Sequence, residues 1–152
     1  MNTKQINKLF CMNPTFKGVF ACDQLRLLKF KAPFALIVNT DPSSKPGTHW
    51  VAIVCDKRRH IEFFDSFGEL PTVRNIQQYI KRSSKSSCYS TTQLQSVRSI
   101  SCGLFAIGFI KARFRGLTLD DFINLFDQKN LRQNDILIDE FVSRCKAYKN
   151  VA

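Results

Sequence analysis

The chain has 152 residues, of which 44% are hydrophobic and 14 are Phe, and its formal net charge is +11. This apolar content is enough for a folded core and excludes intrinsic disorder, and the length suits a single domain over residues 1–152. No apolar run reaches the length of a membrane span, and the polar first residues lack the apolar core of a signal peptide. The sequence therefore predicts a soluble, intracellular protein that is not secreted.

The N-terminal segment predicts a short helix and then a turn. Apolar side chains of residues 3–10 fall on one helical face, Thr3 is the candidate cap, and Pro14 lies in the break that follows. Residues 22–25 predict a turn that leads into a short helical segment. Asp23 either caps this segment or contacts a substrate, and capping is the simpler assignment.

Three strands follow. Residues 35–40 (ALIVNT) are almost continuously apolar, as in a strand that is buried on both faces. Residues 48–55 and 60–65 predict two further strands, and the charged turn 56–59 joins them into an antiparallel hairpin.

This hairpin brings an imidazole and a carboxylate together. If the turn lies near Lys57 and Arg58, His49 and Asp65 fall at the same open end, although they are 16 positions apart in the sequence. His60 starts the second strand at the opposite end, next to the turn, and is therefore left out of the same site.

The second half of the chain predicts mainly helices, with no repeat and no second domain. We expect helices over residues 73–82, 102–113, 118–126 and 135–148. The first of them has one stripe, formed by Val73, Ile76, Gln77 and Ile80. Thr118 is the candidate cap of the third. The last is expected to face the core with Ile136, Leu137, Phe141, Val142 and Cys145. Polar residues 83–87 form a linker, and residues 89–93 are a candidate strand.

The six cysteines are widely and irregularly spaced, and the sequence contains no CxxC pair. A disulfide framework and a zinc or other metal site are therefore not expected. We expect most of these cysteines to be small buried hydrophobes. They are Cys11, Cys22, Cys55, Cys88, Cys102 and Cys145.

Cys102 differs from the others because of its place in a helix. Ser101 occupies the N-cap position, so Cys102 lies in the first turn, where free N–H groups and the helix dipole favour an anion. A thiol there has a lowered pKa and is a better nucleophile. Gly103 has no side chain to obstruct an incoming carbonyl group. The alternative interpretation is a core cysteine on a buried helix.

Four residues together form a candidate catalytic site, in the order His49, Asp65, Gln95 and Cys102. A thiol nucleophile needs a base, which His49 supplies, and the imidazole needs a partner that fixes its tautomer, which Asp65 supplies. The side-chain amide of Gln95 and the backbone N–H of Cys102 are the expected donors to the oxyanion. Each residue taken singly is explained more simply by an ordinary structural role, so the hypothesis depends on the occurrence of all four together.

The charge of +11 results from 23 Lys and Arg against 12 Asp and Glu. Such a surface attracts nucleic acid or another polyanion, and the alternative is a protein that is merely basic and soluble. Few aromatic residues interleave with the basic clusters, so binding to DNA is expected to be independent of sequence. The expected DNA-binding residues are Lys57, Arg58, Arg59, Lys81, Arg82, Lys111, Arg113 and Arg115, with Lys85 beside them.

The chain resembles the adenovirus maturation protease (adenain) and its relatives in adenovirus-like viruses and Polinton/Maverick elements. The segments that carry the resemblance are ALIVNT at 35–40, GTHW at 47–50, FFDSFG at 63–68, and Gln95 followed seven residues later by CGLF at 102–105. The pattern is more distantly similar to the Ulp/SENP SUMO proteases. In that branch an Asp often precedes the cysteine. Here Ser101 precedes it, which favours the viral branch.

The resemblance implies an α+β cysteine-protease fold with a central mixed sheet flanked by helices. It implies an endopeptidase that cleaves viral capsid or core precursors during virion maturation, located in the virion and the host nucleus. Trp50 and Gly103 would contact the substrate. The resemblance implies no metal or small-molecule cofactor. It does imply activation by DNA and by a short viral peptide, which would form a disulfide with Cys88. Asp65 stands where adenoviral enzymes usually carry Glu.

Two other functions stay open. The same scaffold could serve as a SUMO or ubiquitin-like isopeptidase, which needs a groove for a Gly-Gly tail. A non-catalytic, basic DNA-binding protein is the alternative of a different class.

Overall fold

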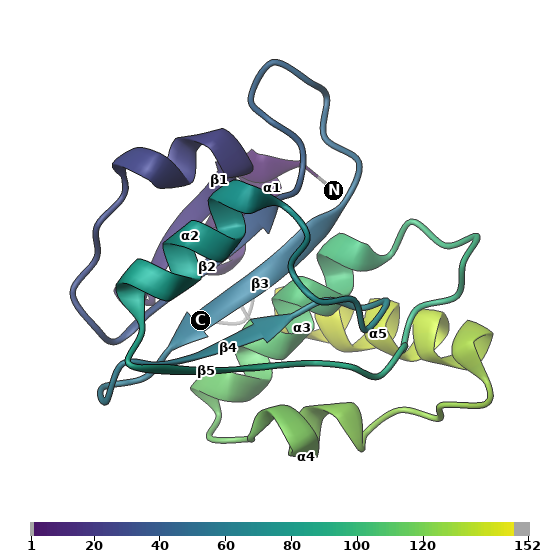
Figure 1. Ribbon diagram of the computed structural model, residues 1–152. Coiled ribbons are helices and arrows are strands. Elements are labelled where there is room, and N and C mark those ends of the chain that lie inside the picture. The colour runs from purple at the N-terminus through teal and green to yellow at the C-terminus, as the bar shows by residue number, and fades with distance from the viewer. Residues whose placement is uncertain (1, 148–152) are drawn as a thin grey trace.

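The computed structural model describes residues 2–147, which form a five-stranded mixed sheet with helices on both faces (Figure 1). The strands are β1 (Phe16–Ala21), β2 (Phe34–Asn39), β3 (Trp50–Cys55), β4 (His60–Phe64) and β5 (Ser86–Tyr89), in this spatial order. β2, β3 and β4 are antiparallel, whereas the edge strands β1 and β5 run parallel to their neighbours. The predicted α+β class and the predicted hairpin are confirmed.

One face of the sheet carries most of the helices. The helices α1 (Thr3–Leu9), α3 (Cys102–Phe114), α4 (Leu119–Ile123) and α5 (Leu131–Ala147) pack there around Phe64, Phe105 and Phe109. The 3-10 helix η1 (Cys22–Leu27) and α2 (Arg74–Ser83) cover the other face, where Tyr79 is fully buried. Because both faces are covered, every residue of β2 is buried, as its continuous apolar run predicts.

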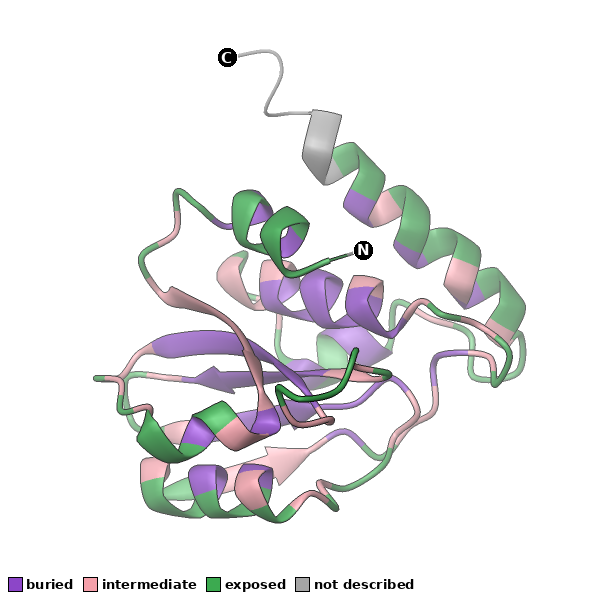
Figure 2. Ribbon diagram, turned by 90° about the horizontal axis from the view of Figure 1, so that it is seen from above, coloured by how far each residue is buried: buried purple, intermediate pink, exposed green. Residues whose placement is uncertain are grey.

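The helix α3 lies between the sheet and the helices α1 and α5 (Figure 2). It is buried along almost its whole length, from Cys102 to Ala112. A buried helix is held by packing on all sides, and this fixes the position of its first residue, Cys102. Ser101 occupies the N-cap position, but its side chain makes no capping hydrogen bond.

Several boundaries differ from the sequence predictions. The cap of α1 is Asn2 rather than Thr3, and its side chain and that of Gln5 form a capping box. The last strand is Ser86–Tyr89 rather than 89–93, because its polar residues need only backbone pairing with β4 at the sheet edge. The predicted cap Thr118 does bond the backbone of its helix.

Two helix faces also differ from the predictions. In α2, Ile76, Tyr79 and Ile80 are buried, whereas Gln77 is exposed and donates to the carbonyl of Pro71. In α5, over residues 131–144, the buried residues are Asn134, Ile138 and Val142, whereas Ile136 and Leu137 are exposed and Phe141 is half-buried. The side chain of Cys145 and residue Tyr148 lie outside the described residues.

Within residues 2–147, no helix is both long and apolar enough to cross a bilayer. The described part of the chain also contains no group of three or more His, Cys, Asp and Glu side chains that could hold a metal ion.

Candidate active site

His49 ends the loop that leads into β3, and backbone geometry fixes its position. Its carbonyl accepts a hydrogen bond from the Thr40 N–H at 2.9 Å, across the base of the loop. Gly47 has a φ of +88°, and a Cβ there would lie 2.2 Å from Nδ2 of Asn39, so only glycine fits. Asn39 in turn accepts from the N–H of Asp41 at 2.8 Å. These contacts hold the loop so that His49 faces Asp65 at the end of β4.

Asp65 follows β4 and is 4% exposed. Its Oδ2 lies 2.9 Å from Nε2 of His49, and its Oδ1 accepts from the N–H of Phe67 at 2.7 Å. The hydroxyl of Ser90 bridges the N–H and the carbonyl of Asp65, at 3.0 Å each. The predicted juxtaposition of His49 and Asp65 is confirmed, and each carboxylate oxygen has one hydrogen-bond partner.

Cys102 is the first residue of α3 and interacts with the same imidazole. Burial opposes the thiolate, but the hydrogen bond and charge of His49 and the backbone N–H groups of Trp50 and Gly103 outweigh it and lower the pKa of Cys102. Burial likewise opposes the imidazolium, but the hydrogen bonds and charges of Asp65 and Cys102 raise the pKa of His49 to about 9. Because Nε2 of His49 bonds Asp65, Nδ1 is the nitrogen left for the thiol. The two shifts favour a thiolate–imidazolium pair.

These shifts predict a bell-shaped pH dependence of kcat/KM. The thiolate is lost as pH falls through the lowered pKa of Cys102, and the imidazolium is lost as pH rises through about 9. We therefore expect the alkaline limb near pH 9 when peptide hydrolysis is measured across about pH 5 to 10. An alkaline limb near the ordinary histidine pKa of about 6.5 would contradict the ion pair.

Gln95 is buried beside the cleft, and both ends of its side-chain amide make hydrogen bonds within the protein. Nε2 donates to the carbonyl of Ser99 at 2.8 Å, and Oε1 accepts from the hydroxyl of Ser66 at 2.6 Å. The segment around it is tied to α5, because Asn134 donates to the carbonyl of Leu94 at 3.0 Å.

His49, Gln95 and Cys102 line one cleft, which has a volume of about 1100 Å³. Trp50 and Gly103 line it too, and a Cβ at position 103 would lie 3.6 Å from the indole ring. The indole ring of Trp50 therefore lies within ordinary van der Waals distance of the position next to the thiol. Sequence reasoning did not identify the remaining wall residues, which come from α1, α3, α5 and three loops. They are Gln5, Lys8, Leu9, Gly47, Thr48, Phe67, Ser99, Ile100, Ser101, Leu104 and Asp139.

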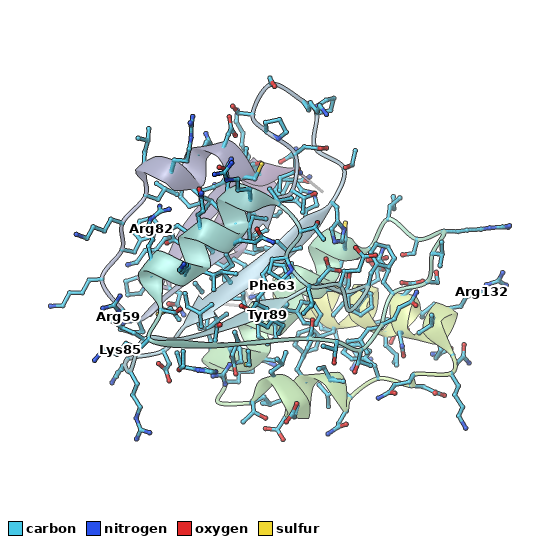
Figure 3. All side chains as sticks on the ribbon, viewed as in Figure 1. Arg59, Phe63, Arg82, Lys85, Tyr89 and Arg132 are labelled. Carbon is cyan, nitrogen blue, oxygen red and sulfur yellow. The ribbon has the colours of Figure 1, made fainter. Side chains whose placement is uncertain are left out.

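Most of the predicted DNA-binding residues gather at the end of the sheet farthest from Cys102. In Figure 3, Arg59, Arg82 and Lys85 lie together at one edge of the molecule and Arg132 at the opposite edge. The turn that carries Arg59 contacts the end of α2, since the Lys85 N–H donates to the carbonyl of Arg59 at 2.8 Å. We call the exposed set the basic end. It consists of Lys57, Arg58, Arg59, Lys81, Arg82 and Lys85.

Some of the predicted basic residues are engaged within the protein. The guanidinium of Arg113 is paired with Glu62 of β4 and also donates to the carbonyl of Leu117, so it is not offered to phosphate. Lys111 and Arg115, on the same helix or at its end, lie over the rings of Phe10 and Phe141 respectively. Arg82 donates to the carbonyl of Leu28 at 3.1 Å and also to that of Leu25. Arg59 donates from Nε to the carbonyl of Ser83 at 3.2 Å.

Cys88 lies on the edge strand β5 and is half-buried rather than exposed. Its Sγ is 3.3 Å from Nε2 of His60, and Nδ1 of His60 is 2.7 Å from the hydroxyl of Ser86. Burial and the nearby carboxylates of Glu62 and Asp120 raise the pKa of Cys88. These features disfavour the thiolate that disulfide exchange with an activating peptide needs.

A thiol at the start of a buried helix, an imidazole beside it and a carboxylate behind the imidazole form the arrangement of a thiol hydrolase on an α+β fold. The chain belongs to the Ulp1 protease family, because the model of that family's C-terminal catalytic domain matches residues 16–144. This confirms the resemblance drawn from the sequence motifs.

Individual relatives include viral proteases. A cysteine protease of African swine fever virus (isolate Tick/Malawi/Lil 20-1/1983) is 31% identical over 123 residues, which cover 70% of this chain and 45% of that protein. The chain thus spans less than half the length of this relative. The protease of bovine adenovirus 4 is 28% identical over 165 residues, which cover 89% of this chain and 81% of that protein.

The fold is shared with a solved bacterial structure. ChlaDub1 from Chlamydia trachomatis superposes with a TM-score of 0.53 at 17% identity, covering 75% of this chain and 60% of that chain. This likeness concerns the fold alone.

Proposed function

We propose that this chain is a cysteine endopeptidase that cleaves viral capsid or core precursor proteins during virion maturation. The observation that carries the proposal is the hydrogen-bonded His49–Asp65 pair, with the pKa of His49 raised to about 9 and that of Cys102 lowered. The relatives in two viruses support the viral class of substrate. This role would place the protein in the virion and in the nucleus of the host cell.

The site residues divide the steps of the reaction among them. Sγ of Cys102 attacks the peptide carbonyl carbon, and the oxyanion that forms is stabilised by the backbone N–H of Cys102 and the amide of Gln95. The imidazolium of His49 gives its proton to the leaving amine as the C–N bond breaks, which leaves a thioester on Cys102. His49 then accepts a proton from the water that attacks the thioester, and the free carboxylic acid leaves. Asp65 orients the imidazole throughout.

A degenerate peptide library tests the proposal most directly. The protein is incubated with the library and the new N-termini of the products are sequenced, with the Cys102→Ala variant as the control. We expect cuts after small residues, as the resemblance to the adenoviral proteases implies. A library left uncut would overturn the endopeptidase proposal.

A SUMO or ubiquitin-like isopeptidase is the second candidate function. The family is named for Ulp1, and one African swine fever virus relative carries the name SUMO-1 cysteine protease. The two functions are separated by offering the same preparation SUMO precursors and viral capsid precursors. A peptide-aldehyde probe that labels Cys102 distinguishes both from a non-catalytic DNA-binding protein.

We also propose that DNA binds the basic end independently of sequence and raises the rate of precursor cleavage. The support is a cluster of exposed positive charges that lies away from the cleft, so phosphate contacts there leave Cys102 accessible. If four of these side chains each neutralise one phosphate, the slope of log affinity against log salt on duplex DNA should be about −4.

Matched double variants test this partner. Lys81→Ala with Lys85→Ala should reduce that slope by about 2, because two phosphate contacts are lost. Lys129→Ala with Arg132→Ala removes the same charge from exposed positions elsewhere and should leave the slope nearly unchanged. Arg59 and Arg82 are kept, because both bond backbone carbonyls. Equal slopes for the two variants would contradict a defined basic site.

A further inference from the structure

Ser66 directly follows Asp65 and contacts the segment that carries Gln95. It is 1% exposed, and its carbonyl accepts hydrogen bonds from the N–H groups of Leu94 and Gln95, at 2.9 and 3.0 Å. Its hydroxyl donates to Oε1 of Gln95 at 2.6 Å. The two consecutive residues after β4 thus contact the same site: Asp65 contacts the imidazole of His49, and Ser66 contacts the amide of Gln95.

The chemistry of the partners fixes which way the Gln95 amide points. The carbonyl oxygen of Ser99 can only accept, so the group 2.8 Å from it must be the NH₂ and not the oxygen. Oε1 therefore faces Ser66, whose hydroxyl must donate. Gln95 is itself only 1% exposed, so bulk water does not reach this oxygen to replace the hydroxyl.

The NH₂ group has two protons and needs only one for the carbonyl of Ser99. Its distance to the hydroxyl of Ser99 is 3.4 Å, which is long for a hydrogen bond. Among the described residues, this long contact is the second proton's nearest acceptor, and Gln95 lines the same cleft as Cys102.

We propose that Ser66 is a positioning residue, which holds the Gln95 amide so that its second N–H donates to the oxyanion of the reaction. The inference rests on the proposed cysteine-protease function and assigns to Ser66 a task that the motif does not show. Preorganised donors act because they need no reorientation as charge develops. Without the Ser66 hydroxyl, Oε1 is buried without a donor and the amide is free to tilt.

The expected effect is on turnover rather than on substrate binding. Loss of an oxyanion donor costs about 100- to 1000-fold in kcat, so Gln95→Ala should fall in that range with little change in KM. Ser66→Ala keeps the donor but loosens it, and should lower kcat by about 10- to 100-fold with KM unchanged. Ser84→Ala removes a hydroxyl that bonds the carbonyl of Ile80, and serves as the matched control with kcat near that of the wild type.

Alkylation of Cys102 by iodoacetamide separates a positioning role from a general disturbance of the site. This displacement forms no oxyanion, so Ser66→Ala should keep the wild-type rate and pH profile while peptide hydrolysis falls. Mass spectrometry assigns the adduct to Cys102, because Cys11 is also exposed. A parallel loss of alkylation would mean that Ser66 supports the fold of the site and would overturn the proposal.

A double variant decides whether Ser66 acts through Gln95. In the Gln95→Ala background, adding Ser66→Ala should cost nothing further, since the amide is already gone. Additive losses would overturn the inference. If the wild type cleaves no substrate, the proposed function fails instead. The amide position is then read from the NMR signals of the Gln95 NH₂ group, which should move in Ser66→Ala but not in Ser84→Ala.

Discussion

Replacing Cys102 with Ala should abolish peptide cleavage, because the reaction then has no nucleophile at the helix start. The fold should survive, since Ala is a good helix former and the change removes one sulfur atom, so the free energy of unfolding should stay within about 1 kcal/mol of the wild-type value. Turnover of a fluorogenic peptide and chemical denaturation measure the two quantities on the same preparation.

A second thiol–imidazole contact in the molecule provides the matched control for Cys102→Ala. Cys88 lies 3.3 Å from Nε2 of His60, but the other nitrogen of that ring faces Ser86 rather than a carboxylate. Burial and nearby carboxylates also raise the pKa of Cys88 instead of lowering it. Cys88→Ala should therefore keep wild-type turnover. Full activity in Cys102→Ala, or loss of activity in Cys88→Ala alone, would show that Cys102 is not the nucleophile.

The catalytic geometry could be predicted from the sequence because it depends on local rules. Strand alternation and a short charged turn fix the hairpin register, which brings the start of β3 and the end of β4 together and so places His49 near Asp65. The apolar run after Ser101 fixes the start of α3, and with it the place of Cys102.

The walls of the cleft could not be predicted, because they depend on how distant helices pack. Nothing in the spacing of Lys8 or Asp139 indicates that α1 and α5 line the same cleft as the thiol. Asn134 lies one residue before the predicted start of the last helix, and it is fully buried because it bonds the carbonyls of Leu94 and Asp127. Its burial turns Ile136 and Leu137 outward.

The partners of the basic residues could not be predicted from the sequence either. The sequence shows charge but not partners, and Glu62 lies 51 positions before Arg113. Only the packing of α3 against the sheet brings them together, which converts a candidate phosphate contact into an internal ion pair.

His49→Ala should lower kcat/KM by about 10⁴-fold or more, because one change removes the base, the acid for the leaving amine and the charge that holds the thiolate. Asp65→Asn should be milder, at about 100-fold, since it keeps the shape of the side chain and loses its charge. The two variants are compared in the same peptide assay, with iodoacetamide alkylation of Cys102 as the readout of the thiolate.

The pH dependence of kcat/KM distinguishes the role of Asp65 from that of His49. The hydrogen bond and charge of Asp65 help raise the pKa of His49 to about 9, so Asp65→Asn should move the alkaline limb of kcat/KM toward lower pH. His60→Ala is the matched control, because His60 lies at the other end of the hairpin and bonds Ser86 and Cys88 instead, so both its rate and its profile should stay close to wild type. An alkaline limb that stays near pH 9 in Asp65→Asn would mean that the carboxylate does not govern the imidazole.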